Sequence, residues 1–399
     1  MNKPFRFTIF VIHRFLFTFH MSNIIVIGAG MVGSAMAIDM AKEHRVTLTD
    51  ISPERLETIR SKHGDIEVRQ LDVTDKADLA EAIRPFDLVI CAVPGFLGFE
   101  TLRTIIETGK NVVDISFFSE NALELDALAR EKKVTAIVDC GVAPGMDNIL
   151  LGHHNELMEI ESFECLVGGL PKVRKWPFCY KAPFSPIDVI EEYTRPARYV
   201  ENGVEIVREP LTDCEYVEFE KVGTLESFNT DGLRSIIHTM GHIPNMKEKT
   251  LRYPGHVEYI MALKQSGFFS KKEIEFHGNR VRPLDFTSKV LIDEWKLGDE
   301  EEELTVMRVT IRGVSSTGER EEIVYDLHDE YCHDTHTSSM SRTTGYTATA
   351  AANMLLEGLF EEKGVFPPEL VGKNEACFEY ILDYLGKRDV VYSKKVRKL

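Results

Sequence analysis

The stretch Asn23-IIVIGAGMVG-Ser34 decides the fold of the N-terminal part of this 399-residue chain. Its apolar run predicts a strand, and the glycines that follow predict a tight turn into a helix. Gly28 permits the turn, Gly30 lets the backbone approach a pyrophosphate, and Gly33 lets the helix pack close to the strand. The free N–H groups at the start of the helix would then meet the anion. The predicted pyrophosphate-binding turn therefore consists of Gly28, Ala29, Gly30, Met31, Val32 and Gly33.

Apolar runs and amphipathic segments alternate from Asn23 to about Leu151. The six apolar runs are 24–28, 46–50, 66–72, 88–93, 111–116 and 134–139. The segments with helical spacing between them are 31–42, 53–61, 75–83, 96–108 and 121–132. Near-continuous Val/Ile runs separated by helices are typical of a parallel sheet covered on both faces. We therefore predict an α/β domain with a doubly wound parallel sheet, the Rossmann arrangement, whose turn binds a dinucleotide.

Asp50 lies 22 residues after Gly28 and ends the second predicted strand. A carboxylate at this place can accept hydrogen bonds from both hydroxyls of the adenosine ribose. It would repel a 2′-phosphate, so the sequence favours NAD over NADP. The neighbouring Ser52 and Arg55 keep NADP open as an alternative, because an arginine there can accommodate that phosphate.

Two further strand ends add cofactor candidates. Asp72 and Val73 follow the third strand, where adenine contacts are usual, although the same residues could simply precede the helix that starts near Asp75. Val93 and Pro94 follow the fourth strand, where the backbone can line the nicotinamide side of the crevice.

The pattern changes near Ile160, where strand-like runs become longer and more alternating. This alternating pattern predicts an antiparallel sheet with a few helices, which would form an α+β domain inserted after the sixth strand. We expect the first domain to span residues 21–151 and to be completed by about 340–399, with the inserted domain at 152–339. The acidic run Asp299–Glu303 reads as a solvated turn, and Thr347–Glu361 as an Ala-rich helix.

The formal charge of −17, from 47 basic and 64 acidic residues, argues against nucleic acid and anionic membranes as partners. Seven scattered cysteines with no CxxC pair do not suggest a disulfide framework, so the cytoplasm is the expected compartment. Residues 1–20 are expected to form an extension outside the folded protein, with a targeting segment as the alternative.

Several segments of the chain resemble the saccharopine dehydrogenase family, and are most similar to its lysine 6-dehydrogenase branch. The resemblance rests on CAVPGF (91–96), VVDISF (112–117), DCGVAPGMDNIL (139–150), VIEEYTRPARYVENG (189–203), DGLRS (231–235), TLRYPGH (250–256) and SSMSRTTGYTA (338–348). It implies a mixed-sheet substrate and dimerisation domain, and a homodimer. It also implies a reaction, in which NAD oxidises the ε-amino group of L-lysine to an imine and water releases ammonia and a semialdehyde that cyclises.

Hydride can leave the ε-carbon only when the adjacent nitrogen has a free lone pair, so a general base is expected. Asp114 is the favoured base or imine stabiliser, and a cap on the following loop is its alternative. His256 is a rival base, against a satisfied structural histidine. Cys140 is a third catalytic candidate, but it is more simply interpreted as a small residue packed in the core. Asp147 could orient the substrate amine or favour a helix start.

A substrate carboxylate needs an arginine or lysine partner. Arg234 and Arg252 are the candidates, and an interdomain or dimer ion pair is the alternative for each. Tyr180 and Lys181 could also reach the substrate.

The run His328–His336 contains possible zinc ligands, but it reads as a polar loop, and hydride transfer needs no metal, so no metal site is predicted. Three functions remain open: a lysine 6-dehydrogenase, another carbon–nitrogen dehydrogenase such as a saccharopine reductase or an opine- or carboxyspermidine-type enzyme, and a non-catalytic NAD-binding regulator.

Overall fold

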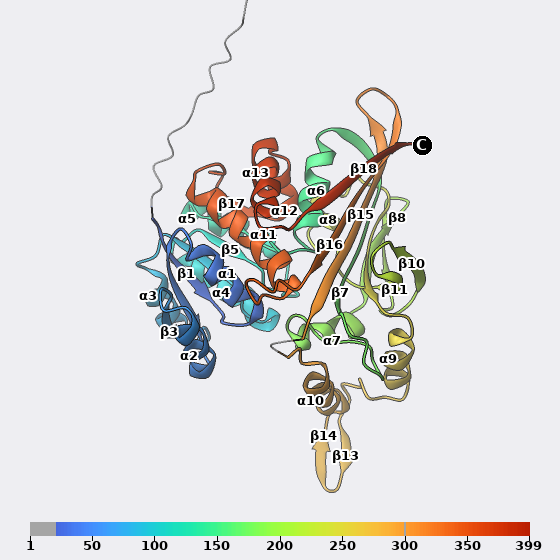
Figure 1. The fold of residues 1–399 in the computed structure, drawn as a ribbon, viewed down its shortest axis with the longest axis horizontal. Helices are drawn as coiled ribbons and strands as arrows, with labels where there is room; N and C mark the ends of the chain where they lie inside the picture. The colour runs from blue at the N-terminus through green and yellow to red at the C-terminus, as the bar shows by residue number, and fades with distance from the viewer. Residues whose placement is uncertain (1–20, 299–300) are drawn as a thin grey trace, which may run out of the picture.

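The computed structural model describes residues 21–298 and 301–399 (Figure 1). The expectation that residues 1–20 form an extension lies outside the described residues. So do the first two residues of the acidic run, Asp299 and Glu300.

The N-terminal domain is built on a parallel sheet of seven strands, in the order β17-β6-β5-β4-β1-β2-β3. Strands β1 to β6 have the order 3-2-1-4-5-6 of a dinucleotide-binding doubly wound sheet. This order confirms the predicted fold class. The seventh strand, β17, comes from the C-terminal part of the chain and pairs with β6. The strands are β1 (Asn23–Ile27), β2 (Arg45–Asp50), β3 (Glu67–Gln70), β4 (Leu88–Cys91), β5 (Val112–Asp114), β6 (Thr135–Ile137) and β17 (Gly364–Phe366).

Helices cover both faces of this sheet, which explains why its central strands are apolar without alternation. On β1, Ile24 and Val26 pack toward one layer of helices, while Ile25 and Ile27 pack toward the other, and all four are buried. The first layer contains α1 (Met31–Met40), α2 (Pro53–Lys62) and α11 (Ser339–Leu356). The second contains α3 (Lys76–Ile83), α4 (Gly95–Glu107) and α5 (Asp126–Lys132), preceded by the 3-10 turn η1 (Ala122–Leu125).

The second sheet has nine strands, in the order β10-β11-β12-β7-β15-β16-β18, with β8 attached to β12 and β9 to β8. Its pairings are antiparallel as predicted, except that β7 and β12 run parallel, which makes the sheet mixed. The strands are β7 (Met158–Pro171), β8 (Ala197–Glu201), β9 (Val204–Arg208), β10 (Glu215–Phe219), β11 (Gly223–Asn229), β12 (Met246–Arg252), β15 (Glu303–Ser315), β16 (Arg320–Glu330) and β18 (Tyr392–Lys398).

Shorter elements surround this sheet. The helices α6, α12 and α13 pack together, and α6 also packs on β7. The hairpin β13–β14 projects from the end of the molecule that carries α10 (Figure 1). These elements are α6 (Met146–Asn155), α7 (Pro186–Thr194), α8 (Ile236–Thr239), α9 (His256–Gln265), α10 (Pro283–Trp295), α12 (Pro368–Gly372), α13 (Glu375–Gly386), β13 (Ile274–Phe276) and β14 (Asn279–Val281).

The C-terminal segment serves both sheets. Helix α11 packs on α1 and β17 extends the parallel sheet, as expected for residues that complete the first domain. Strand β18, however, pairs with β16 of the second sheet. The expectation that the whole of 340–399 belongs to the first domain is therefore wrong for this last strand, whose backbone groups complete the edge of the mixed sheet.

The acidic run also differs from its prediction at one residue. Glu303 is not part of a solvated turn, because it begins β15 with its side chain fully buried. Its carboxyl group accepts hydrogen bonds from the backbone N–H groups of Ser339 and Met340, at the start of α11. Burial raises the pKa of Glu303 to about 8. The residue thereby joins the second sheet to a helix of the first domain.

None of the helices in the described part of the chain combines the length and apolar character needed to cross a membrane.

Candidate functional site

A cleft of about 1470 Å³ lies where the carboxyl ends of the parallel strands face the second domain. Its first wall contains the turns that follow β1 to β6, and its second wall contains residues of β7, α7 and β12. Ligands of doubly wound sheets bind at this edge. All eleven residues predicted to bind the cofactor line the cleft.

The glycine-rich turn is fixed by close backbone packing. Gly28 has a φ of +106°, and a Cβ there would lie 2.4 Å from the carbonyl oxygen of Ala92. A Cβ on Gly33 would lie 1.9 Å from the carbonyl oxygen of Gly28. A Cβ on Gly30 would instead meet no described atom within 4 Å. The first and third glycines are therefore required by the protein itself, whereas the second leaves room for a ligand.

Helix α1 begins at Met31 with no side-chain cap and no acidic residue in its first turn. Its leading N–H groups and the positive end of its dipole are therefore available to an anion. Because this end lines the cleft, the turn fits the pyrophosphate of a dinucleotide.

Asp50 ends β2 and fixes the turn to the neighbouring strand. Its Oδ2 accepts a hydrogen bond from the backbone N–H of Ala29 at 2.7 Å, and its Oδ1 accepts one from the N–H of Ser52 at 2.8 Å. Arg55 lies 3.8 Å from the same carboxylate, with most of its side chain exposed. A carboxylate and an exposed guanidinium group thus lie together at the predicted ribose position.

The other two cofactor segments also lie at strand ends. Asp72 accepts hydrogen bonds from both the N–H and the hydroxyl of Thr74, contacts that lower its pKa. Asp75, and not Asp72, caps α3. Val93 and Pro94 precede α4, which begins at Gly95.

Arg252 is the only predicted substrate residue that lines the cleft. Its Nη2 donates to Glu192 Oε2 at 2.7 Å and to the hydroxyl of Tyr180 at 3.3 Å. Its Nε donates to the hydroxyl of Tyr193 at 3.3 Å, and its Nη1 to the carbonyl of Leu251 at 2.9 Å. Within residues 21–298 and 301–399, these four contacts leave one of the five guanidinium hydrogens for a ligand.

His256 lies behind Arg252 and does not line the cleft. Its Nδ1 is 2.9 Å from the carbonyl of Phe178, which can only accept, so Nδ1 carries the proton. Burial and the charge of Arg252 lower the pKa of His256 to about 3, so the ring is neutral and its Nε2 accepts from Tyr193 at 2.9 Å. In this position His256 orients the tyrosine that accepts from Arg252.

Charged side chains with an acidic majority line the second-domain side of the cleft. The acidic residues on this side are Asp188, Glu191, Glu192, Asp231 and Glu248, and the basic ones are Arg195, Arg252 and Lys296. Arg195 lies 3.5 Å from Glu191 and Arg252 2.7 Å from Glu192, so two of the three cations are already paired. Asp231 is paired with Arg198 at 2.9 Å, which leaves Asp188 and Glu248 without an ion pair among the described residues. Burial raises the pKa of Asp188 and of Glu192. A cationic ligand would offset the free-energy cost of burying these carboxylates in their charged form.

The remaining predicted catalytic residues lie beneath the wall of the cleft. Asp114 is fully buried, and its carboxylate accepts from the N–H of Ser116 at 2.9 Å and from its hydroxyl at 3.0 Å, the contacts of a loop cap. Burial raises the pKa of Asp114 to about 7. Cys140 packs against α11, with its Sγ 3.9 Å from the carbonyl of Thr347, and burial raises its pKa. In this structure neither side chain contacts the cleft.

The other predicted substrate residues also have partners inside the protein. Arg234 donates to Asp139 at 2.9 Å and to the carbonyl of Phe118 at 2.6 Å, which is the interdomain ion pair named as its alternative. Lys181 donates to the carbonyl of Glu294 at 2.6 Å. Tyr180 is buried against Arg252, and Asp147 Oδ1 accepts from the N–H of Gly145 at 2.9 Å, where its helix begins.

Family models match nearly the whole described chain. The saccharopine dehydrogenase NADP binding domain matches residues 24–137, and the saccharopine dehydrogenase C-terminal domain matches residues 141–391. The chain belongs to the saccharopine dehydrogenase family. It is an oxidoreductase that acts on a carbon–nitrogen bond, and its cofactor is a nicotinamide dinucleotide.

Curated relatives of this saccharopine dehydrogenase family member differ in the reactions they are named for. Carboxyaminopropylagmatine dehydrogenase of Synechocystis sp. is 21% identical over 374 residues, which cover 88% of this chain and 92% of that protein. The mitochondrial alpha-aminoadipic semialdehyde synthase of Mus musculus is 23% identical over 87% of this chain, which spans only 45% of that longer protein. The NADP-dependent, L-glutamate-forming saccharopine dehydrogenase of Schizosaccharomyces pombe is 26% identical over 64% of this chain and 60% of that protein.

A solved structure shows the same fold. The apo saccharopine dehydrogenase (L-Glu forming) of Saccharomyces cerevisiae matches with a TM-score of 0.76 and 19% identity, over 94% of this chain and 100% of that one. The two-domain architecture is thus shared with that enzyme.

Sequence reasoning missed the charged residues of α7, although they stand in the stretch VIEEYTRPARYV that carries the family resemblance. A usable signal was present. Val189, Ile190 and Tyr193 form the buried face of this helix, so the intervening positions face away from the core. Glu191 and Glu192 stand at those positions, Arg195 follows the last helical residue, and all three line the cleft.

Proposed function

We propose that this protein oxidises the ε-amino group of L-lysine with NAD, and releases ammonia and the 6-semialdehyde. The observation that carries the proposal is the carboxyl of Asp188, which lines the substrate side of the cleft and makes no ion pair with a described residue. L-Lysine has two ammonium groups and one carboxylate, so it is a net cation. Saccharopine has three carboxylates, and the two paired arginines and Lys296 offer little free positive charge to bind them.

The reaction balances without a further co-reactant. One hydride leaves the ε-carbon for the nicotinamide ring, and the nitrogen lone pair forms the carbon–nitrogen double bond. Water then adds to that bond, ammonia leaves, and the α-amino group closes on the aldehyde. The ε-ammonium group of lysine has a pKa of about 10.4, so it must lose a proton before hydride transfer.

We propose that one of two carboxylates on α7 receives that proton. Asp188 and Glu192 both lie on α7 and line the cleft. The backbone N–H of Gly95, next to the predicted nicotinamide segment, forms a hydrogen bond with the carboxylate of Asp188. The raised pKa of each carboxyl brings it closer to that of the amine, which makes it a better base. We propose that the reacting amine lies beside Asp188 and Glu192, and that Arg195 and the remaining hydrogen of Arg252 bind the α-carboxylate.

NAD is the proposed cofactor because of Asp50. A 2′-phosphate placed beside its carboxylate would be repelled, and Asp50 is held in place by two backbone hydrogen bonds. The homodimer implied by the resemblance stays a prediction.

A substrate panel tests the proposal. NADH formation is followed at alkaline pH with L-lysine, saccharopine, ornithine and a blank. We expect turnover with L-lysine and release of one ammonia per NADH. Reduction of NAD by saccharopine alone would overturn the assignment, and tight NAD binding without any turnover would favour a regulator.

A second candidate is a dehydrogenase for a carboxyaminoalkyl guanidine or polyamine. It is favoured by the Synechocystis relative, which this chain matches over 92% of that protein's length. An acidic cleft also suits a guanidinium group. Adding carboxyaminopropylagmatine to the panel distinguishes the two, because the lysine enzyme should leave it unoxidised.

A further inference from the structure

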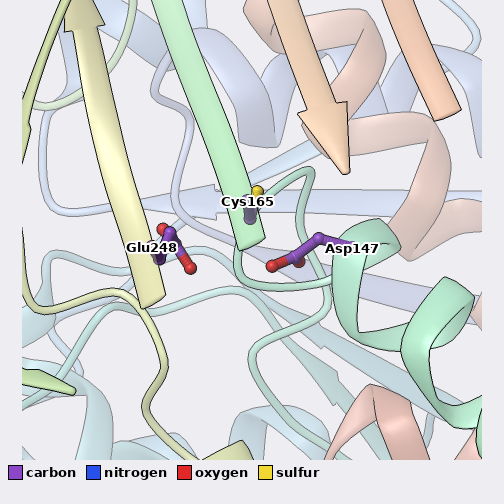
Figure 2. A group of neighbouring side chains, drawn as sticks. All are labelled: Asp147, Cys165 and Glu248. Carbon is purple, nitrogen blue, oxygen red and sulfur yellow. The ribbon is translucent and has the colours of Figure 1, made fainter. Parts of the chain in front are cut away.

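Three ligand-type side chains that hydride transfer does not require meet beside the cleft. The carboxylates of Asp147 on α6 and Glu248 on β12 point toward each other, and Cys165 on β7 lies between these two elements (Figure 2). One carboxylate oxygen of each acid and the cysteine sulfur lie within 4.8 Å of one another. The cluster therefore joins a helix and two strands that are distant in the sequence.

Each of the two carboxylates has one oxygen without a hydrogen-bond partner among the described residues. Asp147 and Cys165 are fully buried, and Glu248 is 3% exposed. Asp147 Oδ1 accepts from Gly145, but Asp147 Oδ2 and Glu248 Oε2 have no hydrogen-bond partner among the described residues. Buried oxygens of this kind are costly unless a cation or proton lies between them.

The backbone around Glu248 holds its carboxylate close. A Cβ on Gly232 would lie 1.9 Å from Oε1 and 2.5 Å from Oε2 of Glu248. A side chain at position 232 would therefore displace the carboxylate. Glycine at this position keeps it against the second wall of the cleft.

We propose that Asp147, Cys165 and Glu248 bind one zinc ion. The sulfur of a thiolate and the oxygens of a carboxylate are both zinc ligands. The thiolate makes binding of magnesium or calcium unfavourable. Three protein ligands would leave a fourth position for water or another ligand, as in open zinc sites.

The spacing requires only a small contraction. For three atoms within 4.8 Å of one another, some point lies within about 2.8 Å of each (4.8 Å divided by √3), compared with zinc bonds of about 2.0–2.3 Å. Side-chain movements of up to ~0.8 Å would complete the site. Glu248 lines the cleft, so an ion can enter from that side.

Cobalt titration of the metal-free full chain tests the proposal. Co²⁺ replaces zinc in such sites, and a bound thiolate gives a near-ultraviolet charge-transfer band. We expect one Co²⁺ per chain with that band, and competition by Zn²⁺. Cys165→Ser should abolish the band, and Glu248→Gln should weaken Co²⁺ binding roughly 10–100-fold or more.

Cys332→Ser is the matched control, because Cys332 lies beside His333 and His336 in the other metal-like run of the sequence. It should leave the band and the stoichiometry unchanged. NADH binding and circular dichroism verify that each variant folds. The proposal is overturned if the wild-type chain gives no thiolate band, if Cys332→Ser removes it, or if folded Glu248→Gln binds Co²⁺ as tightly as the wild type.

Discussion

The two sides of the cleft differ in what fixes their ligand-facing groups. On the cofactor side, backbone N–H groups and glycine positions within one strand-turn-helix do so. On the substrate side, charged side chains from α7 and β12 pair with one another across the second domain. A site formed by the backbone can be predicted from a short sequence motif. A site formed by paired side chains cannot, because it depends on which distant elements come into contact.

The glycine turn provides the largest expected difference. Gly33→Ala places a Cβ against the carbonyl of Gly28, so it should destabilise the protein by about 2 kcal/mol. It should also weaken NADH binding roughly 100-fold, or about 2.7 kcal/mol. Gly30→Ala meets open space, so it should leave thermal stability unchanged while weakening NADH binding. Calorimetric titration and thermal melts measure both, and equal melting losses for the two variants would contradict the account of the turn.

The Arg252–Glu192 pair is the corresponding test on the substrate side. Arg252→Met leaves Glu192 without its partner, which should cost about 3 kcal/mol of stability and most of kcat/KM for lysine. NADH affinity should stay at its wild-type value, because the pair lies on the opposite wall. Urea unfolding and steady-state kinetics provide the readouts. Arg252→Met combined with Glu192→Gln should recover part of the stability, and failure to do so would remove the pair from the account.

Asp50→Ala tests the cofactor preference. Losing the ribose partner should weaken NAD binding about 10-fold, roughly 1.4 kcal/mol, while NADP binding stays equal or improves through Arg55. Dissociation constants for both cofactors measure the ratio. Equal losses for NAD and NADP would place the ribose away from Asp50.

Glu303 concerns the joint between the two domains, and its effect is spread over the pH range from 4.5 to about 8. Its pKa is raised from 4.5 to about 8, so its contribution to stability is complete below about pH 4.5 and is lost as the pH rises toward 8. Glu303→Gln should flatten the pH dependence of the unfolding free energy in that window, by at most about 1.4 kcal/mol per pH unit. The neighbouring Glu302→Gln is the control, because Glu302 is only half-buried and pairs with Lys172 instead of with α11. Matching pH curves for the wild type and Glu303→Gln would contradict the buried protonated carboxyl.

Prediction from sequence succeeded where local pattern fixes the structure. The six strands, their helices and the glycine turn follow from apolar periodicity and from close approach at Gly28 and Gly33. The strands β17 and β18 were not predicted, because each adds to a sheet whose other strands lie far away in the sequence. Periodicity contains no information about such pairing.

The candidate catalytic residues illustrate the same limit. Asp114 and Cys140 follow the correct strands, yet their side chains turn inward to Ser116 and to α11. Position at a strand end locates the backbone but not the direction of the side chain. Glu192 lies at the cleft because β12 brings Arg252 beside α7, a contact between residues 60 positions apart.

Transfer of deuterium from L-lysine labelled at the ε-carbon tests the central claim most directly. If the acidic wall presents the ε-amine to the nicotinamide, NADH formed by the wild-type chain should carry one deuterium, and kcat/KM should fall with a primary isotope effect. Glu192→Gln should lower kcat/KM for lysine and leave NADH binding unchanged. Unlabelled NADH, or label transferred only from lysine deuterated at the α-carbon, would contradict the account.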